Sequence, residues 1–286
     1  MKIPKRIQPL IEDGLIDEVL SQLMSGKEAT VYVVRCGSDI RCAKVYKDAG
    51  KRSFKQAVQY REGRKVRNTR RARAMEKGSK YGREEQESLW HNAEVDALYK
   101  LANAGVRVPQ PYGCFDGVLL MELITDEDGG VAPRLNDVTM SAEQAREDFQ
   151  VIIRDIVRML CAGLVHGDLS EFNVLVDEDG PVIIDLPQAV DAVANNHAEW
   201  MLERDVNNMR NYYAMFAPEL LETQYAKEIW AIYEEGKLTP DTALTGIFAE
   251  PESEADVDSV LLEIKEAFDE EQARLARMNH SDQDDN

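Results

Sequence analysis

The first 125 residues show mainly the alternation of apolar and polar positions that is typical of β-strands. Segments 25–34 (SGKEATVYVV) and 41–47 (RCAKVYK) alternate in this way, and the turn-forming sequence CGSD separates them. Segment 114–124 (CFDGVLLMELI) predicts a second hairpin, with Asp116–Gly117 as its turn. The pattern therefore predicts two β-hairpins in the first part of the chain.

Two segments in this part instead show the spacing of an α-helix. The helix predicted over 14–23 rests on Leu15, Val19 and Leu23. A second helix is predicted over 88–105, ending at Gly105. Its apolar stripe consists of Leu89, Ala93, Ala97 and Leu101.

Helices dominate the pattern after residue 127. The segment 141–163 opens with a capping box, Ser141 and Gln144, and ends at Gly163. Further elements are the short strands 174–176 and 181–185, helices over 198–216, 218–236 and 256–278, and a helix start at Thr239–Pro240. Strands followed by helices predict an α+β fold with two lobes, and the crossover falls at Glu122–Asp126.

Composition indicates a globular chain without a membrane span. Of its 286 residues, 44% are hydrophobic and 30% are charged. No run of 18 apolar residues occurs, and the N-terminus lacks the apolar region of a secretory signal. The scattered cysteines favour a reducing cytoplasm, with each one a small buried or half-buried residue without a disulfide partner. They are Cys36, Cys42, Cys114 and Cys161.

Charge is distributed unevenly along the chain. The formal net charge is −19, yet residues 51–83 hold 13 Lys and Arg against 2 Glu, a net charge of +11. Residues 250–286 hold 13 Asp and Glu against 3 Lys and Arg, a net charge of −10. A basic segment in an acidic protein predicts a polyanionic partner such as RNA, or an intramolecular contact with the acidic tail.

The segment 165–176, VHGDLSEFNVLV, places polar residues between two apolar arms. Asp168 offers a carboxylate that can accept a proton from an attacking hydroxyl, and Asn173 offers a neutral oxygen that suits Mg²⁺. Asp185 ends an apolar strand twelve residues later, so it could share a metal bound to nucleotide phosphates. His166 is interpreted as a structural hydrogen-bonding residue rather than as a general base.

A cation for those phosphates is expected in the first part of the chain. Lys44 shares one strand face with Cys42 and Tyr46, and an inward lysine needs an anion. Glu94, in the middle of the predicted helix, is the candidate for its ion-pair partner.

Several of these segments resemble the RIO-type atypical protein kinases. The resemblance rests on SGKEATVY, AKVYK, WHNAEVDALYKL followed by VPQP, HGDLSEFN and IDLPQA, which occur in the family's order from about Gly14 to about Gly236. The absence of a winged-helix pattern before SGKEA makes the chain similar to the first RIO subfamily. The resemblance implies a two-lobed kinase-like domain over residues 1–250, followed by an acidic helical tail over 251–286. Within that domain it implies an N-lobe to about residue 121, a hinge at about 122–126 and a C-lobe from about 127.

The resemblance also implies a role for each matching residue, with ATP and Mg²⁺ or Mn²⁺ as cofactors. Asp168 would be the catalytic base, Asn173 and Asp185 would hold the metal, and Asp185 would also be the phosphorylated residue if the chain works as an ATPase switch. Lys44 would contact the α- and β-phosphates and pair with Glu94. The remaining nucleotide contacts would come from Ser25, Gly26 and Lys27 over the phosphates and from Glu122 and Ile124 at the adenine edge, with Met121 behind them.

Departures from ordinary protein kinases agree with this resemblance. The segment SGKEATVY has one glycine where those kinases have a G-x-G-x-x-G loop, and Asp185 is followed by Leu186–Pro187 rather than by Phe-Gly. The tripeptide Ala217–Pro218–Glu219 is interpreted as a chance match to the APE motif. Because RIO kinases lack the usual activation segment, the resemblance predicts no standard peptide-docking groove.

Three functions fit these residues. The first is a serine/threonine kinase that acts on a protein or on itself, or that works mainly as an ATPase in ribosome or ribonucleoprotein assembly. The second is a small-molecule phosphotransferase of the aminoglycoside-kinase kind, against which SGKEA, the basic segment and IDLPQA argue. The third is an assembly factor that uses ATP as a conformational latch. The first and third need the same site, and ribosomal precursor RNA is the expected partner of segment 51–83.

Overall fold

The computed structural model describes residues 3–26, 29–47 and 93–249. All the helices and strands described here belong to one compact unit, Met1–Ile247, and a second unit comprises Phe248–Asn286. The basic segment 51–83, the predicted helix over 256–278 and residue Lys27 lie outside the described residues. The helix predicted over 88–105 is described from residue 93 and ends at residue 103.

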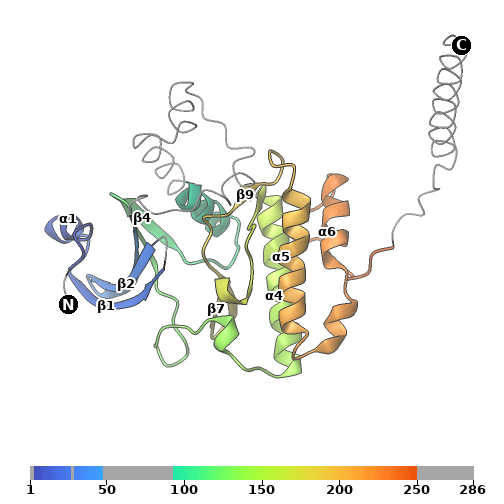
Figure 1. The fold of residues 1–286 in the computed structure, drawn as a ribbon, viewed down its shortest axis with the longest axis horizontal. Helices are drawn as coiled ribbons and strands as arrows, with labels where there is room; N and C mark the ends of the chain where they lie inside the picture. Colours follow the sequence, from blue (N-terminus) through green and yellow to red (C-terminus); the bar gives the residue numbers. More distant parts are fainter. Residues whose placement is uncertain (1–2, 27–28, 48–92, 250–286) are drawn as a thin grey trace, which may run out of the picture. The chain divides into compact units, whose positions relative to one another are not determined.

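A five-stranded antiparallel sheet forms the first half of this unit (Figure 1). Its strands are β1 (Glu18–Ser25), β2 (Ala29–Cys36), β3 (Asp39–Tyr46), β4 (Pro111–Phe115) and β5 (Val118–Glu122), in the order β1-β2-β3-β5-β4. Both predicted hairpins, β2–β3 and β4–β5, are present. Their turns use left-handed residues, Gly37 with φ +64° and Asp116–Gly117 with φ +46° and +77°. Central strand β3 places Lys44 opposite Val31 of β2 and Leu119 of β5.

The helix predicted over 14–23 is wrong, because β1 occupies residues 18–25. Apolar residues four apart fit a helix face, but here the main chain pairs with β2 from Glu18↔Arg35 to Ser25↔Thr30, with two bulges. β1 is an edge strand whose side chains are mostly exposed, so burial does not impose a two-residue alternation on its sequence. The N-terminal helix is instead the short α1 (Gln8–Glu12), with Pro9 in its first turn.

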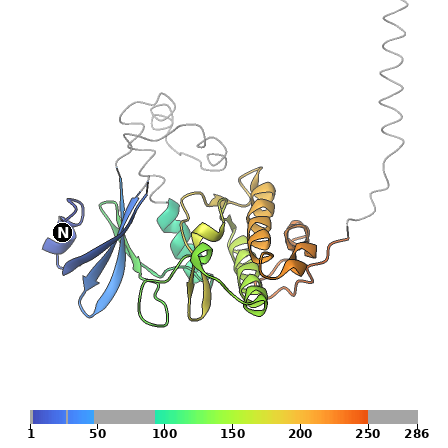
Figure 2. The same cartoon turned by 60° about the horizontal axis from the view of Figure 1, so that its bottom comes forward.

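Apolar groups cover both faces of the sheet. α1 lies on one side and the helix over 93–103 on the other, as two views show (Figures 1 and 2). The α1 side has its own buried cluster, which consists of Ile7, Leu10, Ile16, Val34, Ala43, Val45, Val118 and Leu120. On the other side, Leu98 and Leu101 of the helix join Leu119 of β5 in the main core, which continues into the second half. The first half is thereby packed directly on the second.

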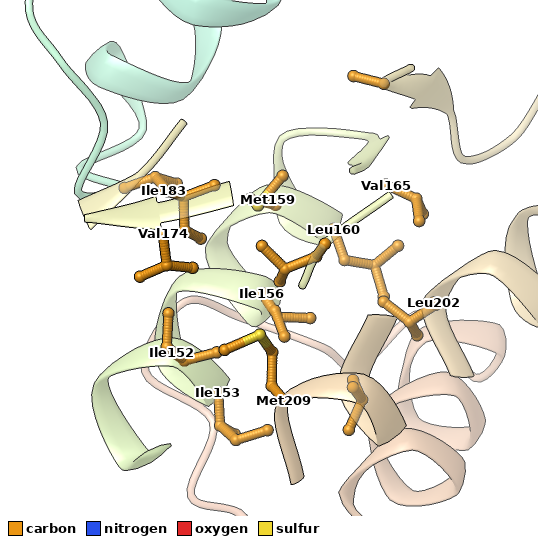
Figure 3. Packing of buried hydrophobic residues seen from close by; sticks show 14 of the residues in the cluster. Ile152, Ile153, Ile156, Met159, Leu160, Val165, Val174, Ile183, Leu202 and Met209 are labelled. Carbon is orange, nitrogen blue, oxygen red and sulfur yellow. The ribbon is translucent and has the colours of Figure 1, made fainter. Parts of the chain in front are cut away.

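Helices build the second half of the unit. Its main elements are α4 (Ala142–Cys161), β6 (Leu164–Val165), β7 (Val174–Asp177), β8 (Gly180–Ile183), β9 (Val190–Asp191), α5 (Ala198–Tyr213) and α6 (Tyr225–Glu234). Short 3₁₀ helices are η2 (Leu135–Asp137), η3 (Glu171–Asn173) and η4 (Pro218–Glu222). Figure 3 shows isoleucines of α4 between Val174 and Ile183 of the β7–β8 hairpin and Leu202 and Met209 of α5. This packing supports the loop that connects β6 to β7.

At the N-terminus of α4 the predicted serine cap is confirmed, but the predicted capping box is incomplete. Ser141 is the N-cap, and its hydroxyl accepts the Gln144 N–H at 3.1 Å. The Gln144 side chain does not complete the predicted capping box, because it donates to Asp148 at 2.8 Å. The carboxylate of Asp148 is buried, so this hydrogen bond satisfies it.

Three smaller predictions are wrong. The helix predicted over 218–236 is divided into η4 and α6, because Thr223 between them has extended backbone angles, φ −77° and ψ 145°. Thr239–Pro240 starts no helix; Thr239 bonds with Thr242 in a turn. Cys114 and Cys161 are exposed rather than buried, and the four cysteines are free thiols in the structure. In the described part of the chain, no helix is both long and apolar enough to cross a membrane.

Candidate active site

Lys44 lies at the centre of an ion cluster that joins the two halves of the unit. Its Nζ is 2.5 Å from Glu94 Oε1 on the helix over 93–103 and 2.8 Å from Asp185 Oδ1, which follows β8. The predicted Lys44–Glu94 ion pair is therefore present. Tyr46, two residues along β3 on the same face, donates its hydroxyl to Glu94 Oε2 at 2.6 Å. Both oxygens of Glu94 are thus held, and the carboxylate keeps Lys44 in place.

The charges in this cluster stabilise one another. Burial would lower the pKa of Lys44, but Glu94 and Asp185 together raise it above its usual value. Burial would likewise raise the pKa of Asp185, but the positive charge of Lys44 holds it below its usual value. Both groups are therefore charged at neutral pH. The Lys44 side chain is 12% exposed, whereas that of Asp185 is 47% exposed, so Asp185 is the member open to a ligand.

The backbone at Asp185 turns sharply after β8. Asp185 has φ +67°, a left-handed conformation that Asp tolerates better than most residues do. The preceding residue is fixed at both main-chain atoms, since Ile184 N donates to Asn173 O at 2.9 Å and its carbonyl accepts from His166 Nε2 at 3.1 Å. These bonds connect Asp185 to the loop that carries Asp168 and Asn173. The structural role predicted for His166 is confirmed by this contact.

A buried carboxylate on α5 holds the loop at residues 167–169. Asp205 accepts the N–H of Gly167 at 2.7 Å and the N–H of Leu169 at 3.0 Å, and Asn208 donates to the Leu169 carbonyl at 3.0 Å. Burial raises the pKa of Asp205 to about 6, although His166 and the two amide N–H groups oppose that rise. The loop is therefore anchored on both sides of Asp168 by side chains of one helix.

Asp168 itself is exposed and is positioned through its main chain. Its N–H donates to His166 Nδ1 at 3.3 Å, and its carbonyl accepts from Asn173 Nδ2 at 2.9 Å. Because the Asn173 amide nitrogen is used in this way, its Oδ1 is left as an acceptor. Burial raises the pKa of the Asp168 carboxyl, while His166 and Arg204 act in the opposite direction. The structure thus brings Asp168, Asn173 and Asp185 together, as the sequence spacing predicted.

The turn between β1 and β2 is held by a lysine that sequence reasoning did not consider. Lys47 Nζ donates to Ser25 Oγ at 2.9 Å and to the Gly26 carbonyl at 2.6 Å. Gly26 N also donates to Ala29 O at 2.9 Å, which closes the turn. Ser25 and Gly26 therefore lie at the end of β1. The next strand, β2, pairs with β3, the strand that carries Lys44.

The segment predicted as the hinge leaves β5 and returns in a tight loop. Glu122 and Gln110 form two hydrogen bonds. Glu122 N donates to the Gln110 carbonyl at 2.8 Å, and Gln110 N donates to Glu122 Oε2 at 3.0 Å. The Ile124 carbonyl accepts Ala132 N at 3.0 Å. Within the described ranges the Ile124 N–H has no protein acceptor, so this amide can serve a ligand.

The sequence pattern did not indicate the supporting roles of Asp205 and Tyr46. Asp205 interrupts the apolar stripe of α5 between Leu202 and Met209, and an acidic residue on a buried helix face signals a main-chain anchor. Tyr46 was placed on the face of Lys44, but its hydroxyl bond to Glu94 depends on a helix 48 residues away. No local pattern reports that contact.

Comparison with known proteins gives consistent matches. The family model of the RIO domain matches residues 30–226. The chain is 35% identical to the RIO-type serine/threonine-protein kinase Rio1 of Haloferax volcanii, over 72% of this chain and 67% of that protein. It is 32% identical to the serine/threonine-protein kinase RIO1 of Homo sapiens and 30% identical to that of Dictyostelium discoideum, over 71% and 81% of this chain. The chain spans only 34% and 38% of those two relatives.

The fold is similar to that of a solved kinase structure. That structure is the Rio2 kinase from Chaetomium thermophilum in a complex with ADP, Mg²⁺ and phosphoaspartate. The TM-score is 0.52 at 21% identity, and the match covers 75% of this chain and 65% of that one. The likeness supports the two-lobed kinase-like α+β fold.

Proposed function

We propose that this chain, which belongs to the RIO family of serine/threonine-protein kinases, transfers the γ-phosphoryl group of ATP to a hydroxyl acceptor in a Mg²⁺-dependent reaction. The observation that carries the proposal is the Lys44–Glu94–Asp185 cluster, which lies beside the loop of Asp168 and Asn173. A held cation, an exposed carboxylate and two oxygen ligands are the groups that phosphoryl transfer needs.

Each residue has a distinct role in this proposal. Lys44, kept charged by Glu94, binds the α- and β-phosphates and gives up its contact with Asp185 when the nucleotide enters. Asp168 orients the acceptor hydroxyl and takes its proton. Ser25 and Gly26, with Lys27, cover the phosphates from the end of β1.

The donor set fits Mg²⁺. Asn173 Oδ1 and Asp185 Oδ2 are oxygen atoms on adjacent, mutually bonded segments, and oxygen is the ligand type that Mg²⁺ prefers. Mg²⁺ bound with a nucleotide takes phosphate oxygens as further ligands, so two protein oxygens suit this role. The ion would neutralise the charge of the phosphates.

Adenine is proposed to bind at the segment between β5 and the loop after it. The Ile124 N–H, which has no acceptor among the described residues, and the Glu122 carbonyl supply one donor and one acceptor for the base edge, with Met121 behind it. This placement puts the base at the end of β5, which pairs with the strand that carries Lys44.

The identity of the phosphoryl acceptor determines whether the chain acts as a kinase or as an ATPase. We propose as acceptor a serine or threonine hydroxyl of another protein or of the chain itself. In place of a hydroxyl, the Asp185 carboxylate is a further candidate, because phosphoaspartate is present in the related Rio2 complex. In the last case an Asp185 oxygen attacks the γ-phosphorus, ADP leaves, and hydrolysis of the acyl phosphate would reset an ATPase switch for ribosome or ribonucleoprotein assembly. The proposed setting is a reducing cytoplasm, in keeping with four free cysteines.

Metal removal tests the proposed function. ATP hydrolysis by the wild-type chain is expected to disappear when EDTA removes divalent cations and to return with Mg²⁺ or Mn²⁺, since the phosphates then regain their counter-charge. The measurement is ADP formation from ATP, which reports both hydrolysis and transfer, with and without casein or an aminoglycoside as acceptor. Hydrolysis that continues in EDTA contradicts the proposal, and stimulation by the aminoglycoside alone favours a small-molecule phosphotransferase.

The charge of segment 51–83 supports a proposal that it binds structured ribosomal precursor RNA. Replacing Arg70, Arg71 and Arg73 by Ala is expected to weaken RNA binding and to flatten its salt dependence, because log affinity falls by about 0.7–0.9 per neutralised phosphate for each unit of log salt. Basal ATPase activity should stay unchanged. Binding titrations at two salt concentrations measure both effects.

The acidic tail provides the control for this prediction. If the tail competes with RNA for the basic segment, removing residues 251–286 should tighten RNA binding. If the basic segment serves only the tail, RNA stays unbound by both forms of the chain. Absence of RNA affinity with and without the tail therefore defeats the proposal.

A further inference from the structure

Arg134 has a firmly fixed main chain at the boundary between the two halves of the unit. It forms a β-bridge with Leu175 of β7, and the neighbouring Pro133 carbonyl accepts Val176 N at 3.0 Å. The next residue, Leu135, is fully buried, and its carbonyl accepts the Tyr212 hydroxyl. Arg134 is therefore held beside β7, the strand that directly follows the loop of Asp168 and Asn173.

The side chain of Arg134 reaches from this position to the first strand of the sheet. Its Nη2 contacts the Sδ of Met24, one residue before Ser25 on β1. Ser25 and Gly26 are the residues that the proposed function places over the phosphates. The guanidinium thus bridges the end of β1 and the segment that enters η2.

This contact does not satisfy the charge of Arg134. In residues 3–26, 29–47 and 93–249 its guanidinium has no carboxylate partner, and its one hydrogen-bonding contact is with a thioether, a weak acceptor. The charge of Arg134 also makes a small contribution to lowering the pKa of Asp185. A five-donor cation with one weak acceptor is suited to an anionic ligand.

We propose that Arg134 is a second phosphate-binding cation, which leaves Met24 and donates to the phosphate chain of a bound nucleotide opposite Lys44. The proposal rests on the proposed ATP site and adds a residue to it. A guanidinium recognises phosphate oxygens through paired N–H donors, whereas the Met24 sulfur offers it little. Because Asp185 and Lys44 already bind each other, Arg134 supplies positive charge that is not neutralised before the ligand arrives.

A nucleotide titration tests this role. Purified wild-type chain and Arg134→Gln are titrated with ATP, ADP and adenosine in Mg²⁺, and affinity is measured by calorimetry. Loss of a charge-assisted phosphate contact is expected to weaken ATP and ADP binding about tenfold or more. Adenosine, which has no phosphate, should bind both proteins equally. Arg134→Lys, which keeps the charge, should retain most of the ATP affinity.

Arg146→Gln provides a matched control. Arg146 is on α4, is half exposed and pairs with Glu219, so its loss removes the same charge away from the nucleotide. Its ATP affinity should equal that of the wild type, which excludes a general effect of net charge. Unchanged adenosine binding by Arg134→Gln also reports that the variant is folded.

The possible outcomes separate this proposal from the proposed function. Equal ATP affinity of Arg134→Gln and wild type, while the wild type binds ATP, overturns the role of Arg134 alone. A matching loss of adenosine affinity also overturns it, because the residue would then act on the nucleoside or on the fold. A wild-type chain that does not bind ATP with Mg²⁺ overturns both.

Discussion

Replacing Asp168 by Asn is expected to slow phosphoryl transfer by about 10²–10⁴-fold, the usual contribution of a positioned general base. The amide keeps the shape of the carboxylate but cannot accept the proton of the acceptor hydroxyl. The loop should keep its conformation, because Asp205 and His166 bind main-chain atoms that the substitution does not alter.

Nucleotide affinity should stay nearly unchanged in Asp168→Asn. The phosphates are proposed to bind Lys44 and the metal ligands, and Asp168 belongs to neither set. The measurement pairs an autophosphorylation rate with an ATP titration in Mg²⁺. Asp179→Asn is the matched control, since Asp179 is an exposed acid in the β7–β8 turn and should transfer phosphate at the wild-type rate. Wild-type autophosphorylation by Asp168→Asn would remove Asp168 from the proposed role.

The elements that the sequence predicted correctly are those whose pattern reflects one dominant cause. β2 and β3 are rich in β-branched residues and each pairs with a strand on both sides, and the β4–β5 turn carries the Asp-Gly pair that its left-handed backbone needs. α4 buries a continuous stripe and begins at a serine cap. Local sequence therefore determined these elements, and tertiary contacts did not override it.

The errors occur where tertiary contacts decide. β1 is an edge strand that pairing with β2 defines, so its own apolar residues are no guide to its conformation. The same limit applies to the site. The short spacing within the loop predicted Asp168 and Asn173 together, whereas Asp205, Tyr46 and Arg134 act through partners 36 to 110 positions away. Such contacts follow from the packed fold rather than from any local motif.

Substitution of Asp185 is expected to weaken binding of the metal–nucleotide complex itself. The change removes a proposed ligand of Mg²⁺ and leaves Lys44 with Glu94 as its only carboxylate partner among the described residues. Asp185→Ala would also place Ala at φ +67°, which costs about 1 kcal/mol or more. Asp185→Asn avoids that strain because Asn tolerates the left-handed region, so the two variants separate the loss of charge from a backbone effect.

Both Asp185 variants should therefore bind ATP more weakly in Mg²⁺, with the difference from wild type reduced in EDTA, where no metal contact is left to lose.

A phosphorylated Asp185 can be recognised by its chemistry, because hydroxylamine cleaves an acyl phosphate but not a phosphoserine. Wild-type chain trapped after reaction with γ-labelled ATP should lose its label in hydroxylamine, and Asp185→Asn should carry no such label. Label that survives hydroxylamine excludes the aspartyl phosphate and directs the search to a serine or threonine. Unaltered Mg²⁺-dependent ATP binding by Asp185→Asn excludes the metal role instead, so each half of the proposal can fail without the other.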